Sequence, residues 1–250
     1  MEGAPVRTLS GSFGPGMNRV MWDLRYTASA TPRLRTPPLE HAHRGVGQEG
    51  WRPPPDGGPV RPLAIPGRYR VRLTAGAVER TAELEILQDP ASTASAEDMR
   101  AQLALQLELR EMSDSTAELI NRIEWTRRGL ADLEERVRGN PLYAEIAEVG
   151  EELALALIEL EMELFDLRLT GGFARQDTIR WPRRLWAKIA SLAGYSAGSD
   201  DPPTESMSEV GGIYRLQLEE YLRRWAELAA DDLADFNRLL AERGLPPIIS

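Results

Sequence analysis

The sequence contains no cysteine, and several other features of catalytic proteins are scarce or missing. Without cysteine the protein forms no disulfide, binds no metal through a thiolate and has no cysteine nucleophile. Only two histidines occur, His41 and His43, and neither is placed to serve a serine nucleophile. Neither a glycine-rich phosphate loop nor a Gly-x-Ser-x-Gly motif is present. The sequence therefore predicts no catalytic residue and no cofactor, and it favours a function other than catalysis.

Long apolar runs and an excess of positive charge are also absent. No apolar run approaches the roughly 18 residues that a membrane-spanning helix needs, so no membrane span is expected. The formal net charge of −9 disfavours a nucleic-acid partner, because phosphates would be repelled. The 250 residues do include 42% hydrophobic and 28% charged residues. This composition is globular and is large enough for one or two domains.

A heptad pattern is the clearest structural signal in the chain. Its members lie alternately four and three residues apart, with charged residues between them: Leu105, Leu109, Met112, Thr116, Leu119, Ile123, Thr126, Leu130, Leu133 and Val137. The pattern predicts a helix over about 95–138. A helix of this length needs equally long partners to cover its apolar seam.

Apolar stripes predict those partners farther along the chain. Long helices are expected over about 141–170 and 204–243, and a short amphipathic helix over about 182–193. Residues 91–250 should therefore form an antiparallel helical bundle.

Residues 1–90 show the alternation of β-strands instead. Residues 18–26 alternate apolar and polar side chains, as a half-buried strand does, and one further strand is plausible at 6–9. Residues 68–73 and 79–86 flank a turn and predict an antiparallel hairpin in which arginines face glutamates. Residues 28–66, rich in Pro, Gly and Arg, are expected to be an insertion draped over the surface. The fold class is thus α+β, with a thin, incomplete antiparallel sandwich.

Two sets of polar residues are weighed as chemical sites. His41 and His43 could offer two metal nitrogens, but no third ligand can be named, so no metal is predicted. Several carboxylates alternate with leucines along the predicted helices and are expected to form solvated faces rather than acid–base pairs: Glu151, Glu152, Glu159, Glu161, Glu163, Asp200, Asp201, Asp231, Asp232 and Asp235.

The densest basic and aromatic cluster comprises Arg180, Trp181, Arg183, Arg184, Trp186 and Lys188. Five of these residues form the candidate interaction surface: Arg180, Arg183, Arg184, Trp186 and Lys188. It could grip a polyanion or stack on a sugar ring. In the favoured alternative, a buried stripe of the short helix includes Trp186 and the arginines lie outside it. Carbohydrate is therefore the alternative ligand, and a protein or a second copy is the expected partner.

Three stretches, GPGMNRVMWDLRY, PGRYRVRLTAG and FNRLLAERGLPPI, resemble the C-terminal region of bacterial sortilin-like or BNR-repeat "glycosyl hydrolase" proteins. The resemblance extends over most of the chain: residues 16–26, 66–89, 121–123, 175–177, 182–192 and 233–248. In that family a large β-propeller precedes a small Ig-like sandwich and a helical tail.

The resemblance implies that residues 1–90 belong to an Ig-like sandwich that begins upstream of Met1. Any hydrolase activity would belong to the propeller, whose Asp-box repeats do not occur in this sequence. Family members are typically exported, which implies a periplasmic or secreted location although no signal peptide is visible. Residues 33–59 depart from the family pattern. The sequence predicts a non-catalytic structural or interaction module; the alternative is a glycan-binding or glycoside-hydrolase-associated protein that uses residues 180–188.

Overall fold

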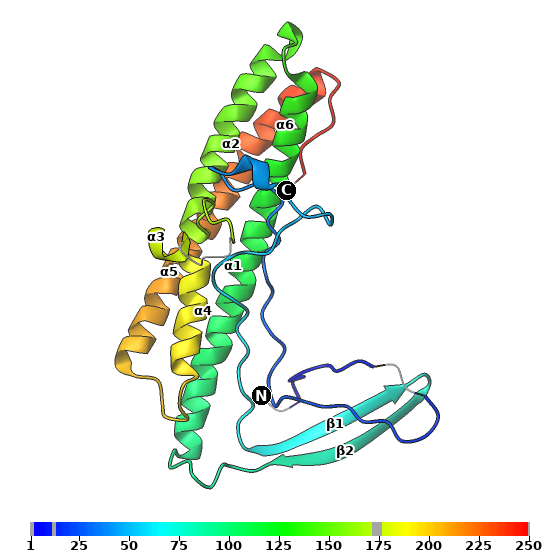
Figure 1. The fold of residues 1–250 in the computed structure, drawn as a ribbon, viewed down its shortest axis with the longest axis vertical. Helices are drawn as coiled ribbons and strands as arrows, with labels where there is room; N and C mark the ends of the chain where they lie inside the picture. Colours follow the sequence, from blue (N-terminus) through cyan, green and yellow to red (C-terminus); the bar gives the residue numbers. More distant parts are fainter. Residues whose placement is uncertain (1–2, 12–13, 172–176, 250) are drawn as a thin grey trace.

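The structure is a computed structural model that describes residues 3–11, 14–171 and 177–249. Arg175 and Gln176, which belong to the family resemblance, lie outside the described residues. The elements follow one another in this order: η1 (Ala42–Arg44), β1 (Gly67–Ala75), β2 (Val78–Ile86), α1 (Ala96–Val137), η2 (Pro141–Tyr143), α2 (Ala144–Leu164), α3 (Asp177–Arg180), α4 (Leu185–Ser196), α5 (Glu205–Ala230) and α6 (Asp232–Glu242). The described residues form an α+β fold in which a two-stranded antiparallel sheet stands beside an elongated helical bundle (Figure 1).

Helix α1 is the axis of this bundle. Its first turn is closed by a capping box, in which Ser95 and Asp98 each accept a hydrogen bond from the other's backbone N–H. All ten members of the heptad pattern are buried. With 42 residues, α1 is about 63 Å long, so shorter helices have to cover it in succession.

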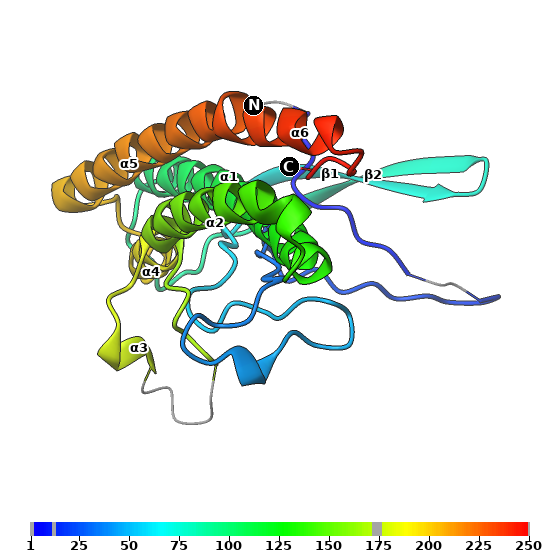
Figure 2. The ribbon, with the colours of Figure 1, turned by 90° about the horizontal axis from the view of Figure 1, so that it is seen from above.

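Different helices cover the two halves of α1 (Figures 1 and 2). Helices α4 and α5 pack against its N-terminal half, and α2 packs against its C-terminal half with α6 beside α2. Helix α5 meets α1 at Gly211, where a Cβ would lie in van der Waals contact, 3.4 Å from Leu105 Cδ1. In the same way the ring of Phe236 in α6 rests on Gly150 of α2.

Two of the long helices differ in extent from the apolar pattern. Helix α2 ends at Leu164 rather than near residue 170, because Phe165 is extended and Asp166 then accepts the N–H of Arg168 at 3.1 Å in a tight turn. The expected helix over 204–243 is divided into α5 and α6 at Asp231.

The segment 28–66 is not draped over the surface as the sequence suggested. Residues 28–39, which we call the strap, run in extended form along α1 and contribute Leu34 to the core with no exposed surface. Two backbone hydrogen bonds, of 3.0 and 2.7 Å, join Leu34 to Arg52, and Val60 is buried as well. The strap therefore completes the core on a face of α1 that the helices leave open.

The sheet is smaller than the sequence predicted. The hairpin β1–β2 forms, but residues 18–26 are not a strand and contribute only a single bridge between Arg25 and Leu63. Leu24 has a φ of 57°, which interrupts the alternation that a half-buried strand requires. Residues 6–9 also lie outside the sheet. The described strands therefore make up one hairpin, and no second sheet lies opposite them among the described residues.

Candidate interaction surface and polar clasp

The hairpin separates its side chains into an apolar and a charged face. The register pairs Tyr69 with Leu84 and Val71 with Ala82, which places these four side chains on one face of the ribbon. That face is uncovered, since Val71 is 48% exposed and Leu73 is 53% exposed. The half-buried environment expected for both strands is therefore missing, because the hairpin projects from one end of the bundle (Figures 1 and 2).

The opposite face is charged and suits contact with water. Arg68 stands across from Glu85 and Arg70 from Glu83, as the sequence predicted, whereas Arg72 faces Thr81 rather than a glutamate. Opposite charges across a strand pair contribute about 0.2–1 kcal/mol each. The apolar face is consequently the face on which hydrophobic side chains remain exposed to water.

The base of the hairpin is held more firmly than its tip. The hydroxyl of Tyr69 donates a hydrogen bond of 2.7 Å to the carbonyl of Ile65, and the ring of Trp22 meets the Tyr69 ring edge-on at a centroid distance of 5.9 Å. Trp22 Nε1 in turn donates to the carbonyl of Arg25. These contacts fix the direction in which the hairpin leaves the bundle.

A set of polar side chains, all buried except the half-buried Arg52, fastens the strap to the helices. We call this set the polar clasp: Thr36, Arg52, Glu124, Arg127 and Glu161. Glu124 of α1 is its centre and has no exposed surface. Its Oε2 accepts the backbone N–H groups of Arg35 and Thr36, and its Oε1 accepts the Thr36 hydroxyl at 2.9 Å. One carboxylate thus holds two successive strap residues.

The same face of α1 holds the rest of the strap in a similar way. Asp114 accepts the N–H of Ala30 at 2.5 Å, and Asn121 accepts the N–H of Arg33 at 2.8 Å. Because an extended chain has no internal backbone hydrogen bonds, these side chains supply acceptors for N–H groups at the exposed edge of the strap.

Arg127 connects the two carboxylates of the clasp. Its Nη1 lies 3.3 Å from Glu124 Oε1 and 2.6 Å from Glu161 Oε2, and all three side chains are buried. Burial raises the pKa of Glu161 well above its ordinary value; the nearby charge of Glu124 raises it further, and Arg127 opposes both effects. Glu161 is thus part of the core, whereas the sequence placed it on a solvated face.

Of the five residues of the candidate interaction surface, Trp186 is buried. Trp186 is only 1% exposed and packs beneath Gly57, so it is a core residue and cannot stack on a sugar ring. Arg184 lies 3.7 Å from Glu163 of α2, and Arg183 lies 3.6 Å from Asp56. Arg180 is exposed and Lys188 is half-buried. The structure thus gives the buried-stripe arrangement of α4 for Trp186. The other tryptophan of the cluster, Trp181, is half-buried, and the guanidinium carbon of Arg168 lies 3.6 Å from its ring centroid.

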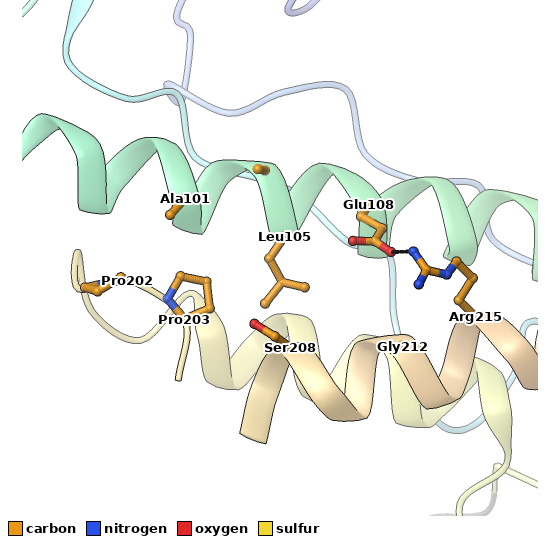
Figure 3. Close-up of a pocket in the computed structure, with 9 residues that line it drawn as sticks. Ala101, Leu105, Glu108, Pro202, Pro203, Ser208, Gly212 and Arg215 are labelled. Atoms are coloured by element: carbon orange, nitrogen blue, oxygen red, sulfur yellow. Dashed lines mark hydrogen bonds and ion pairs between the residues drawn. The ribbon is translucent and has the colours of Figure 1, made fainter. Parts of the chain in front are cut away.

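Two further features offer little to a ligand. The rings of His41 and His43 meet edge-on at 5.8 Å, and no group of three or more His, Cys, Asp or Glu side chains placed to hold a metal occurs in the described part of the chain. A groove of about 380 Å³ lies between α1 and α5 (Figure 3). Its charged residues, Glu108 and Arg215, pair with each other at 3.0 Å, so they are already engaged.

Comparisons of the chain with protein-family models, curated proteins and solved structures found no match. Among the described helices, none is long and apolar enough to cross a membrane. The two features that the described residues leave for interpretation are the exposed apolar face of β1–β2 and the buried polar clasp.

Proposed function

We propose that this protein is a non-catalytic structural and interaction module, and that the apolar face of its hairpin binds another protein. The observation that carries the proposal is the exposure of Val71, Leu73 and Leu84 on one face of a ribbon whose other face is charged. A two-stranded hairpin is marginally stable alone and gains independent stability from further strands or a packed face. A partner that covers this face would supply the missing burial.

The partner that fits best is a second β-sheet. Nine residues in each strand give a face about 30 Å long and two strands wide, to which another sheet could pack about 10 Å away. Such packing would complete the Ig-like sandwich that the resemblance to sortilin-like and BNR-repeat proteins implies. We therefore propose that the module comes from the C-terminal region of such a protein and works outside the cytoplasm.

The area of the hairpin face argues for a partner that reaches beyond it. At about 30 by 10 Å the face amounts to roughly 300 Å², whereas a stable interface buries about 800 Å² on each side. Two hairpins packed only on each other would bury too little to hold a dimer.

Where the buried carboxylates lie supports a non-catalytic role. Glu124 and Glu161 are occupied by the strap and Arg127, without a cleft between them that a substrate could enter. The carbohydrate alternative loses its principal side chain, because Trp186 lies in the core.

A photocrosslinking experiment in the natural host tests the proposal. Benzoylphenylalanine at position 71 lies on the apolar face, and the matched control at position 72 lies on the charged face of the same strand. We expect adducts from position 71 alone, and we expect Leu73→Lys to abolish them. The mass of the adduct separates a second copy from a different protein. A chain that stays strictly monomeric in sedimentation and gives no adduct from position 71 would contradict the proposal.

A further inference from the structure

Two buried carboxylates of the polar clasp share one guanidinium. Glu124 and Glu161 come from different helices, both have no exposed surface, and Arg127 Nη1 contacts one oxygen of each. The other oxygen of Glu161, Oε1, is buried and has no hydrogen-bond partner. A second negative charge at this position would be poorly solvated, because a buried carboxylate needs several donors to remain ionised.

We propose that the strap is closed by a proton: in the closed state Glu161 is protonated, and release of the strap from α1 frees that proton. Four donors already point at Glu124, namely the N–H groups of Arg35 and Thr36, the Thr36 hydroxyl and Arg127. A proton shared by the two carboxylates therefore belongs to Glu161.

The other charged groups around the clasp do not replace this proton. Arg52 approaches from the segment that follows the strap. It donates to the carbonyls of Thr36 (3.1 Å) and Leu169 (3.2 Å), and its buried Nη2 has no hydrogen-bond partner, so no hydrogen bond joins it to a carboxylate. Arg35 leans away from the clasp and stacks on Trp125, with its guanidinium carbon 4.1 Å from the ring centroid.

The carboxylate of Asp166, just after α2, has its own arginine partners outside the clasp. Asp166 is paired with Arg168 at 2.6 Å, and Arg184 lies 3.9 Å from the same oxygen. Glu161 therefore faces one carboxylate, one guanidinium that it shares and one guanidinium that is committed to backbone carbonyls. Because Glu161 Oε1 is buried and accepts no hydrogen bond, protonation neutralises this carboxylate more fully than these guanidinium groups do.

Opening the strap would expose the clasp to water and return Glu161 to its ordinary acidity, near the pKa of 4.5 of a free glutamate. Burial and the Glu124 charge raise the pKa of Glu161 in the closed state, so the closed strap binds one more proton than the open strap. Closure is consequently tightest at low pH. The opening constant rises by up to tenfold per pH unit above about 4.5 and levels off once the pH exceeds the pKa of the closed state.

Hydrogen exchange of the strap amides tests this linkage. The probes are the N–H groups of Ala30, Arg33, Arg35 and Thr36, which α1 side chains accept. Between pH 5 and 8, after correction for intrinsic exchange rates, we expect their protection in the wild type to fall by up to tenfold per pH unit over at least one unit.

The matched variant is Glu161→Gln, which keeps an acceptor for Arg127 but cannot ionise. Its strap amides should be protected to the same extent at every pH in this range. Protection that is independent of pH in the wild type, or the same slope in Glu161→Gln, would overturn the proposal. A carbon-13 titration of the Glu161 carboxyl in the unmodified protein provides a second measurement that needs no variant: a resonance of the ionised form already at pH 5 would also overturn it.

Discussion

Replacing Glu124 by glutamine is the sharpest test of how the strap is held. The change keeps the size and shape of the side chain but turns one oxygen into an amide group that donates hydrogen bonds. In either orientation of the amide, its NH2 group faces hydrogen-bond donors and cannot accept from them. On one side these are the N–H groups of Arg35 and Thr36, and on the other they are the Thr36 hydroxyl and Arg127.

The expected loss of stability follows from the number of donors that lose their acceptor. At least two buried donors lose their acceptor, and each costs about 1–3 kcal/mol. Arg127 also keeps only Glu161 as an acidic partner, and breaking a buried ion pair from one side costs about 3–5 kcal/mol. Because these contributions overlap, we expect Glu124→Gln to lower the free energy of unfolding by about 3–4 kcal/mol.

Urea denaturation followed by circular dichroism measures the effect, with the midpoint interpreted at an unchanged slope. The control is Glu118→Gln, six residues earlier on α1, where the carboxylate pairs with Arg122 and both side chains are exposed. That variant should lie within about 0.5 kcal/mol of the wild type. A loss below about 1 kcal/mol in Glu124→Gln would refute the claim that this carboxylate fastens the strap.

Three further changes test other parts of the structure. Gly57 has a φ of 79°, and a Cβ there would lie 2.7 Å from the Trp186 ring, so Gly57→Ala should lower the thermal midpoint by several degrees while Gly58→Ala, which meets open space, should not. Ser95→Ala removes the cap of α1 and should cost about 1 kcal/mol in urea denaturation, against no change for the exposed Thr93→Ala. Leu73→Lys should leave the stability of the isolated chain within about 0.5 kcal/mol, because this side chain is largely exposed; a larger loss would mean that the hairpin face is already covered.

Patterns within a single element were predictable from the sequence. The heptad spacing of α1 is local, and the ten residues it selected are buried. The hairpin was also accessible, because alternation and the turn at Gly76 fix its register locally. Whether its apolar face would be covered depends on what lies opposite, and no alternation pattern contains that information.

The strap was missed because proline and arginine made it resemble a solvated loop. A signal was nevertheless present: Pro32, Leu34, Thr36 and Pro38, two residues apart, are all buried, and of the residues between them only Arg35 is buried as well. Two residues is the period of an extended chain. On α1 a second stripe beside the apolar seam has the same heptad spacing but contains small and polar members. These are Ser113, Ala117, Ile120, Glu124 and Arg127.

Glu161 was missed for a different reason. Its neighbours Glu159 and Glu163 are less buried, and an acidic residue between leucines usually faces water. Only the approach of Arg127 from another helix makes its burial tolerable, and that contact joins residues 34 positions apart. Long-range pairs of this kind cannot be read from one sequence.

Helix α1 packs against two groups of helices, and this sharing has a mechanical consequence. Helix α1 passes without interruption from the neighbourhood of α4 and α5 to that of α2, so neither group can loosen without affecting the same stretch of backbone. The two ends should therefore melt together in one transition rather than in sequence. Residues 87–95 join the hairpin to the start of α1. A force applied to the hairpin would therefore be transmitted along the whole length of α1.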